Sequence, residues 1–315
     1  MRCSRFCTTQ VRPSYIQLTA PPWRIKTEIL SSGMPYSAPH YCARLEKPEP
    51  HDQIRIERPI VRRNPRNEEC NSIHHTLAIQ TAPRPNHNSL QDTLDSLEHA
   101  GLQKWQGPKL IISDGYVPEI LVSTSTWQVF PVSTSLLPLG SSKTFVALLR
   151  RALEIDPKLK FLTYLQDDIV MSRNSLDYIS QIAVPKELSL VSWFNTDWHK
   201  PDFRPPAILG CRPTRFFIRS QGMTMARAAI DSLLYCHMVN NWPKLDSCDA
   251  MPAWALGDIP YADHYPSLIQ HTEGYNSACN RTLQQHNQGS LWHKGARISP
   301  SFMGEHFDTL SLLPT

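Results

Sequence analysis

Two adjacent carboxylates, Asp167 and Asp168, directly follow the mostly apolar segment 161–166. Such a run is typical of a buried strand that presents acidic side chains at its carboxyl end. In open α/β sheets, ligands bind outside the carboxyl ends of the strands. One or two carboxylates, combined with substrate phosphates, are common ligands of a hard divalent cation. The segment therefore indicates a metal and phosphate site, and the plain alternative is an acidic turn that follows a strand.

Polar residues also end two earlier predicted strands. Segments 76–81 and 109–113 are short, mostly apolar runs, followed by a loop beginning at Ala82 and by Asp114. Because the carboxyl ends of parallel strands meet at one edge of a sheet, we expect these residues to lie beside the acidic pair. Three polar strand ends at one edge indicate a nucleotide site.

Apolar residues at helical spacing separate the predicted strands. Leu90, Leu94 and Leu97 mark the buried face of one predicted helix, and Ser142 begins another. Parallel strands need crossover connections, so this alternation predicts parallel pairing. We expect an α/β fold with a Rossmann-like, mostly parallel sheet flanked by helices. After residue 185 the pattern is less regular, with predicted strands at 188–194 and 215–219 and a predicted helix at 224–239.

Charge and proline content distinguish the first part of the chain. Residues 1–72 hold twelve Lys or Arg against seven Asp or Glu and nine of the 27 prolines, whereas the rest of the 315-residue chain holds twenty against twenty-one. We interpret 1–72 as a basic, irregular, Pro-rich extension with an edge strand at 53–60. A basic arm suits a polyanion such as nucleic acid. A solvated extension packed on the domain is the interpretation that we prefer.

Hydropathy and cysteine patterns exclude some classes. A membrane helix needs about 18 consecutive apolar residues, and no such run exists. The N-terminus lacks the apolar core of a secretory signal, so we expect a soluble, intracellular protein of the cytoplasm. The eight cysteines form no Cys-x-x-Cys pair, which leaves zinc with little support. Buried thiols are the expectation.

Two nucleotide-binding motifs are missing. The loop that begins at Ala82 is not Gly-x-Gly-x-x-Gly, which counts against a dinucleotide-binding domain. The chain has no Gly-x-x-x-x-Gly-Lys-Ser/Thr segment, which counts against a P-loop NTPase.

Two segments resemble those of the GT-A fold glycosyltransferases, including the branching N-acetylglucosaminyltransferase type. Segment 166–168, Gln-Asp-Asp, resembles the short acidic motif that ends the central strand of their nucleotide-sugar domain. Segment 264–271, His-Tyr-Pro-Ser-Leu-Ile-Gln-His, resembles a Tyr-Pro-Ser-Leu-x-Gln-His segment found late in several of these enzymes. The resemblance spans roughly residues 73–280. It implies a nucleotide-sugar-binding half at 73–185 and an acceptor-binding, catalytic half at 186–315.

The resemblance implies a UDP-sugar, or another nucleotide-sugar, as the donor substrate. Transfer of a hexosyl or N-acetylhexosaminyl group to an acceptor hydroxyl would follow, with the acceptor a glycan, a protein or modified DNA. The positions that match donor contacts are Ala82 and Arg84 for the nucleobase, Asp114 for uracil or ribose, Asp167 for ribose or sugar, and Gln221 for the sugar.

The resemblance also implies a bound Mn²⁺ or Mg²⁺. Asp168 matches the direct metal ligand, and His271 is expected to approach the metal or diphosphate from the far side. Gln166 departs from the acidic motif and removes one negative charge. A metal-independent transferase, in which basic residues of the 142–153 helix neutralise the diphosphate, is the alternative.

The acceptor hydroxyl must lose a proton as it attacks the anomeric carbon, so an inverting enzyme needs a carboxylate as general base. We expect inversion and favour Asp249 as the base, followed by Asp258. A helix cap is the structural alternative for Asp249, and a turn residue is the alternative for Asp258. Trp193 and Phe194 are either a sugar-stacking surface or core residues.

Three other functions stay open at this point. A nucleotidyltransferase also uses carboxylate-bound metal, but it usually has a Gly-rich first loop. A non-catalytic nucleic-acid-binding protein would use the basic arm and leave the acidic strand end unexplained. A glycosyltransferase that modifies hydroxylated bases of DNA would use both features, although a duplex acceptor needs its base flipped.

Overall fold

The computed structural model describes the chain in segments. The described residues are 56–59, 74–82, 89–115, 127–132, 140–182, 184–195, 208–214, 217, 220–236, 248, 250–272, 292–293, 296–297 and 299–313. The chain divides at Lys47 and Pro48, and every described residue belongs to the second unit, Pro48–Thr315. Most of the predicted basic extension therefore lies outside the described residues.

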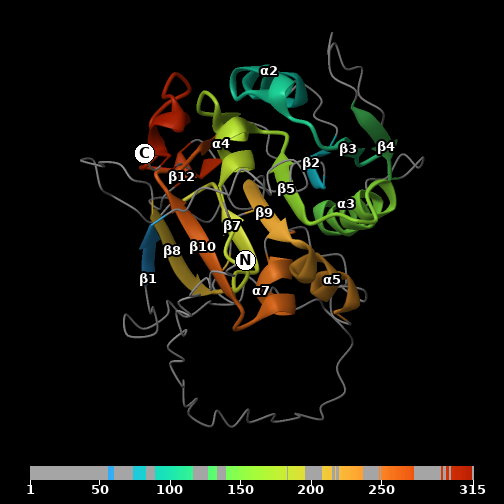
Figure 1. The fold of residues 1–315 in the computed structure, drawn as a ribbon. Helices are drawn as coiled ribbons and strands as arrows, with labels where there is room; N and C mark the ends of the chain where they lie inside the picture. The colour runs from blue at the N-terminus through green and yellow to red at the C-terminus, as the bar shows by residue number, and fades with distance from the viewer. Residues whose placement is uncertain are drawn as a thin grey trace, which may run out of the picture. The chain divides into compact units, whose positions relative to one another are not determined.

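The second unit alternates strands and helices along the chain (Figure 1). The strands of its large sheet are β1 (Ile56–Pro59), β2 (His75–Thr81), β3 (Lys109–Ser113), β4 (Gln128–Pro131), β5 (Phe161–Gln166), β7 (Leu190–Ser192), β8 (Ile208–Pro213), β9 (Gly222–Ala226) and β10 (Pro260–Tyr265). The helices are α2 (Ser89–His99), η2 (Leu102–Lys104), α3 (Ser141–Ile155), α4 (Ser175–Gln181), α5 (Arg227–Tyr235), α7 (Ala250–Leu256) and η4 (Thr309–Leu312). Two small ribbons pair β6 (Ile169–Met171) with β11 (Ile269–His271) and β12 (Trp292–His293) with β13 (Ala296–Arg297).

The large sheet has the order β1-β8-β10-β7-β9-β5-β2-β3-β4. Four neighbouring pairs are parallel and four are antiparallel, because β9, β8 and β1 run against their neighbours. The predicted α/β class, with a central sheet flanked by helices, is confirmed, and the sheet is mixed. The edge strand predicted at 53–60 is β1, which lies at one edge, where Pro59 is tolerated.

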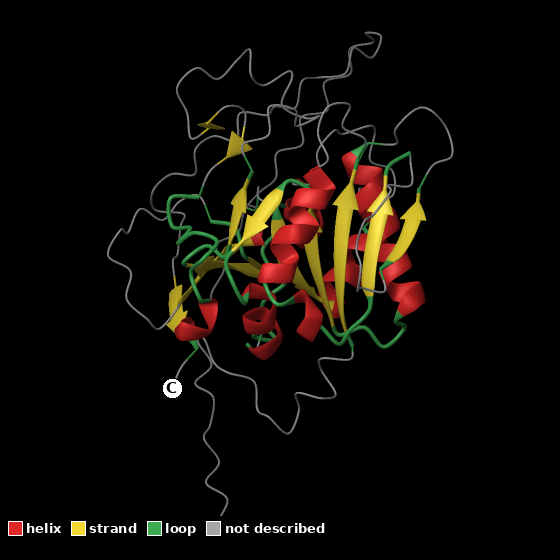
Figure 2. Cartoon of the chain, turned by 90° about the horizontal axis from the view of Figure 1, so that it is seen from above, coloured by secondary structure: helices red, strands yellow, loops and turns green. Residues whose placement is uncertain are grey.

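Different helices cover the two faces of the sheet (Figures 1 and 2). Along β2, Leu77 and Ile79 face α2 and α4, whereas Ala78 faces α3. Helices α5 and α7 pack on the same face as α3. Burial on both faces explains why these strands are nearly continuous apolar runs in the sequence.

The order of the strands reverses at β2. The chain proceeds from β2 to β3 and β4 on one side, and then returns to place β5 on the other side of β2. Both β3 and β5 are parallel to β2, so Thr81, Ser113 and Gln166 end their strands at the same edge. Ligands of open α/β sheets bind at such a switch point, outside the carboxyl ends.

The predicted elements depart from the structure mainly after residue 185. The helix predicted at 224–239 is wrong over its first residues, because 222–226 form β9 and α5 begins at Arg227. Strand β9 pairs with β5 and β7 on its two sides, and this non-local pairing overrides the helical spacing. The strand predicted at 215–219 lies outside the described residues apart from Phe217.

None of the described helices is both long and apolar enough to cross a membrane. Cys211, Cys236 and Cys248 are thiols, and Cys211 and Cys248 are buried, as expected.

Candidate active site

Asp168 and His271 form the centre of the candidate site. Each side chain is about 5 % exposed, and Asp168 Oδ2 lies 2.9 Å from His271 Nε2. Asp168 follows β5, beside the switch point between β2 and β5. The two residues predicted as metal ligands therefore meet at the carboxyl edge of the sheet.

A short antiparallel ribbon brings His271 to this edge. Residues of β11 pair with β6, which starts at Ile169 directly after the acidic pair, and His271 lies opposite Ile169. The backbone N–H of Thr272 donates to the carbonyl of Asp168 at 2.9 Å. The late His-containing segment is thus fastened to the end of the acidic motif by backbone hydrogen bonds.

Asp167 is directed toward β2 and α2. Its Oδ2 accepts hydrogen bonds from Thr81 Oγ1 at 2.6 Å and from Ser89 Oγ at 3.3 Å. Thr81 ends β2 and Ser89 begins α2, so this buried carboxylate joins three elements at the site. Its contact with ribose or sugar stays a prediction.

Asp114 occupies the neighbouring strand end, as predicted. Its backbone N–H donates to the carbonyl of Thr81 at 3.0 Å, and its Oδ2 accepts from the N–H of Gly140 at 2.9 Å. Gly140 immediately precedes α3, so Asp114 links the end of β3 to the start of that helix. Ala82, half-buried, extends β2 at the same edge. Both positions suit a base or ribose contact, which stays a prediction.

Gln166, which directly precedes the acidic pair in the chain, belongs to a network of polar side chains. Its Nε2 donates to Ser220 Oγ at 2.8 Å, and Ser220 Oγ lies 3.3 Å from Cys248 Sγ. The hydroxyl of Tyr164 lies 3.6 Å from the same sulfur and donates to Gln80 Oε1 at 2.9 Å. The residue that departs from the acidic motif therefore has a structural role of its own.

Gln221 carries a buried polar atom that no described residue satisfies. The side chain is 8 % exposed, and its Oε1 accepts no hydrogen bond within the described part of the chain. Its backbone carbonyl accepts from the N–H of Gln166 at 3.1 Å, so the residue lies beside the end of β5. An unsatisfied buried acceptor costs about 1–3 kcal/mol. A ligand that donates an N–H or O–H to Gln221 would recover this free energy.

Of the two candidate bases, Asp249 and Asp258, the structure describes only Asp258. Asp249 lies outside the described residues, as does Arg84. Asp258 is wrong as a base, because it is exposed and precedes β10. Strand β10 is parallel to β7, and β7 has the same direction as β5 because both are antiparallel to β9. Asp258 therefore lies at the amino edge of the sheet, opposite to Asp168. The sequence did not reveal the direction of β10, which depends on long-range pairing.

Trp193 and Phe194 are core residues. Both are fully buried, and Trp193 Nε1 donates to Thr224 Oγ1 at 2.9 Å. Neither ring is available to stack on a sugar, so the core interpretation of this segment is correct.

His264 has a structural role inside the late segment. Its Nδ1–H donates to the carbonyl of Pro266 at 2.6 Å, so Nε2 is the acceptor for the hydroxyl of Tyr178 at 2.8 Å. Burial lowers the pKa of His264 to about 4, while the hydrogen bond to Pro266 opposes this shift. Burial also raises the pKa of Tyr178. The pair is neutral at physiological pH and holds the turn that leads into β11.

The Asp168–His271 pair fits a divalent cation. Two adjacent ligands of an octahedral ion, each at about 2.1 Å, lie about 3.0 Å apart. The two groups form a direct ion pair at 2.9 Å, and this separation is also close to that ligand-to-ligand distance. The described residues contain no group of three or more His, Cys, Asp or Glu side chains that would hold a metal by itself. The pair would supply two ligands and leave the remaining positions to water and phosphate.

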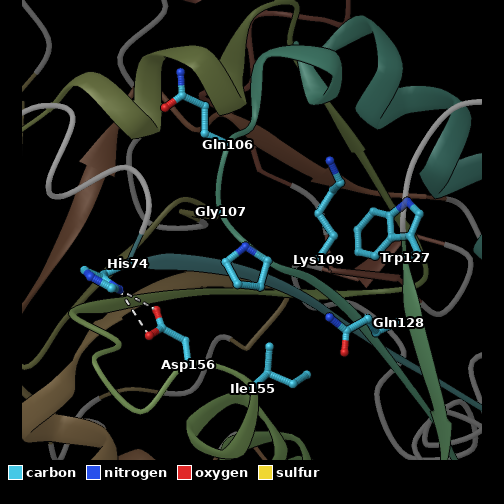
Figure 3. A pocket seen from close by; sticks show the side chains of 9 residues that line it. His74, Gln106, Gly107, Lys109, Trp127, Gln128, Ile155 and Asp156 are labelled. Carbon is cyan, nitrogen blue, oxygen red and sulfur yellow. Dashed lines mark hydrogen bonds and ion pairs between the residues drawn. The ribbon is translucent and has the colours of Figure 1, made fainter.

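A separate cavity of about 750 Å³ lies at the opposite, amino edge of the sheet (Figure 3). It is lined by His74, Gln106, Gly107, Pro108, Lys109, Trp127, Gln128, Ile155 and Asp156. His74 Nδ1 lies 3.1 Å from both carboxylate oxygens of Asp156. Only the return of the chain from α3 toward β2 brings these two residues together.

Comparison with models of known protein families gave no match, and comparison with curated proteins also gave none.

Proposed function

We propose that this protein is a glycosyltransferase that uses a divalent cation and a nucleotide-sugar donor, of which a UDP-sugar is the one we favour. The supporting observation is the 2.9 Å approach of Asp168 and His271 at the carboxyl end of β5, next to the switch point of the sheet. A carboxylate and an imidazole in such a place are suited to hold a cation against a diphosphate.

The position of the acidic pair in the sheet also supports the proposal. In the nine-stranded sheet, β5 lies next to the middle strand β9 and is an interior strand with β2 on its other side. The resemblance to GT-A enzymes implies an acidic motif after the central strand of the nucleotide-sugar domain. Asp167 and Asp168 follow β5, which is compatible with that implied position.

The donor would lie across the ends of β2, β3 and β5. Asp114 would accept hydrogen bonds from the base or ribose, and the buried Oε1 of Gln221 would accept one from a donor hydroxyl or N–H. Mn²⁺ or Mg²⁺ held by Asp168 and His271 would stabilise the charge that develops on the diphosphate leaving group.

Transfer breaks the bond between the anomeric carbon and the diphosphate oxygen and forms one to the acceptor oxygen. The acceptor proton passes to a carboxylate, for which Asp249 is the candidate that remains. The preceding residue, Cys248, is buried and lies 3.3 Å from Ser220 Oγ and 3.9 Å from Gln166 Nε2. Because Gln166 ends β5, Cys248 lies near the carboxyl edge of the sheet.

The test compares two carboxylate–histidine pairs at opposite edges. Melting temperature is measured with UDP, other nucleotides and Mn²⁺ for the wild type, Asp168→Asn and the control Asp156→Asn. We expect UDP with Mn²⁺ to stabilise the wild type and the control, because a ligand that binds only the native state raises its stability. Asp168→Asn should lose this shift.

A nucleotide shift that persists in Asp168→Asn would contradict the metal assignment. Absence of any nucleotide shift, together with no release of nucleoside diphosphate from a panel of nucleotide-sugars, would contradict the transferase.

A further inference from the structure

The side chain of Gln270 faces away from the acidic pair. It is half-buried, whereas its neighbours Ile269 and His271 on β11 are buried. Successive side chains of a strand point to opposite sides, so His271 faces Asp168 and Gln270 faces the other way. On that other side lies Ser299, the first residue of segment 299–313, which we call the C-terminal segment.

One amide group ties His271 to the C-terminal segment. Gln270 Oε1 accepts from the backbone N–H of Ser299 at 2.8 Å and from that of His271 at 3.2 Å. Gln270 Nε2 donates to the carbonyl of Ser299 at 3.3 Å. Both backbone donors face Oε1 and the carbonyl faces Nε2, so the network determines the orientation of the amide.

The C-terminal segment is itself firmly attached to the unit. Ser301 Oγ accepts from the N–H of Ser267 at 3.1 Å, and Asp308 Oδ1 accepts from Asn174 Nδ2 at 3.0 Å. Leu312 is fully buried in the core formed with α2 and α4. Gln270 is therefore held by a segment with its own anchors, at both of its ends.

We propose that Gln270 is a positioning residue: through Ser299 it uses the C-terminal segment to hold His271 against Asp168. The inference rests on the proposed function, in which His271 and Asp168 bind a cation. Residues that orient a metal ligand contribute about 10–100-fold to metal affinity. Gln270 would act on the cation without contacting it, and a loose C-terminal segment would weaken the site.

The experiment measures the dissociation constant for Mn²⁺ without nucleotide, by titration calorimetry, together with the melting temperature. Gln270→Met keeps the size of the side chain and removes all three hydrogen bonds, and we expect it to weaken Mn²⁺ binding about 10-fold or more. Gln270→Glu keeps both acceptor contacts but turns a carboxylate oxygen toward the carbonyl of Ser299, so its Mn²⁺ affinity should lie between those of Gln270→Met and the wild type. Gln91→Met is the control, because Gln91 Nε2 donates to Asp95 Oδ1 at 2.8 Å on the exposed side of α2, away from β11.

A second variant loosens the segment from its far end. Asp308 is 42 % exposed, and Asp308→Ala removes the bond to Asn174 without touching β11. We expect this variant to weaken Mn²⁺ binding several-fold, which also keeps the test decisive if Gln270→Met does not fold.

The outcomes separate this inference from the proposed function. If the wild type binds Mn²⁺ and Asp168→Asn does not, but Gln270→Met and Asp308→Ala bind as the wild type does, the positioning role is wrong and the metal site stands. A lower melting temperature with unchanged Mn²⁺ affinity has the same meaning, because the role is then only structural. Failure of the wild type to bind Mn²⁺ would overturn both proposals.

Discussion

The side chain of Ile269 fills the space next to the backbone of Gly222. A Cβ at Gly222 would lie 2.1 Å from Ile269 Cδ1 and 3.1 Å from Leu165 Cδ2. Gly222 begins β9, and Ile269 lies two residues before His271 on β11. The absence of a side chain at residue 222 thus lets the β6–β11 ribbon lie close to the sheet, where it carries His271 to Asp168.

Gly222→Ala should destabilise the protein by about 1–3 kcal/mol, because it overpacks a buried contact. Ile269→Val removes the Cδ1 atom that the new Cβ meets, so the double variant should recover part of the loss. Urea unfolding of the four proteins in a double-mutant cycle measures this coupling. Additive effects of the two substitutions would show that the close approach does not limit the packing.

Gln221→Leu should leave stability unchanged or raise it, since it replaces a buried acceptor that no described residue satisfies. The same change should weaken nucleotide-sugar binding about tenfold, because the ligand loses an acceptor. Stability is measured by urea unfolding and affinity by titration with UDP-sugars. An equal loss of both quantities would mean that Gln221 supports the fold rather than the donor.

Thr81→Val should destabilise the protein by about 1–3 kcal/mol, because the carboxylate of Asp167 loses the 2.6 Å hydrogen bond from Thr81 Oγ1. Thr76 lies on the same strand and is fully buried, and its hydroxyl has no hydrogen-bond partner among the described residues. Thr76→Val is therefore the matched control and should be neutral or stabilising. Chemical unfolding of both variants checks the difference, and equal losses would assign the effect to strand packing.

Stability should fall as pH decreases from about 6.5 to about 4 because of His264. The unfolded state binds a proton in this window, whereas folded His264, with a pKa of about 4, stays neutral. The loss from this residue is about 3 kcal/mol at the acid end and does not grow further below it. Unfolding free energies at pH 7.5, 6.5, 5.5 and 4.5 measure the slope.

In His264→Gln the side chain at this position cannot bind a proton. Unfolding of the variant should therefore take up close to one proton fewer than that of the wild type in this window, so its free energy of unfolding should change less steeply with pH. The same slope in the variant and the wild type would assign the acid sensitivity to other groups.

Local sequence patterns correctly predicted several strands of the large sheet. Segments 76–81, 109–113 and 161–166 were predicted as strands, and they are β2, β3 and β5 with nearly the same bounds. A short continuous apolar run is a property of neighbouring residues, so a short window is enough to find it. The positions of Asp114 and Asp168 at one edge followed from the strand order, because successive parallel strands end on the same side.

Other features depend on contacts between distant residues. The direction of β10 placed Asp258 at the wrong edge, and pairing with β5 and β7 turned the start of a predicted helix into β9.

The amino-acid sequence by itself determined the alternation of strands and helices and the acidic end of β5, because both features depend only on residues that are close together in the chain. Only the tertiary structure decided that His271 meets Asp168 and that Gln270 meets Ser299. Those contacts require the β6–β11 ribbon and the packed C-terminal segment, which form only when segments far apart in the chain bury their apolar side chains together.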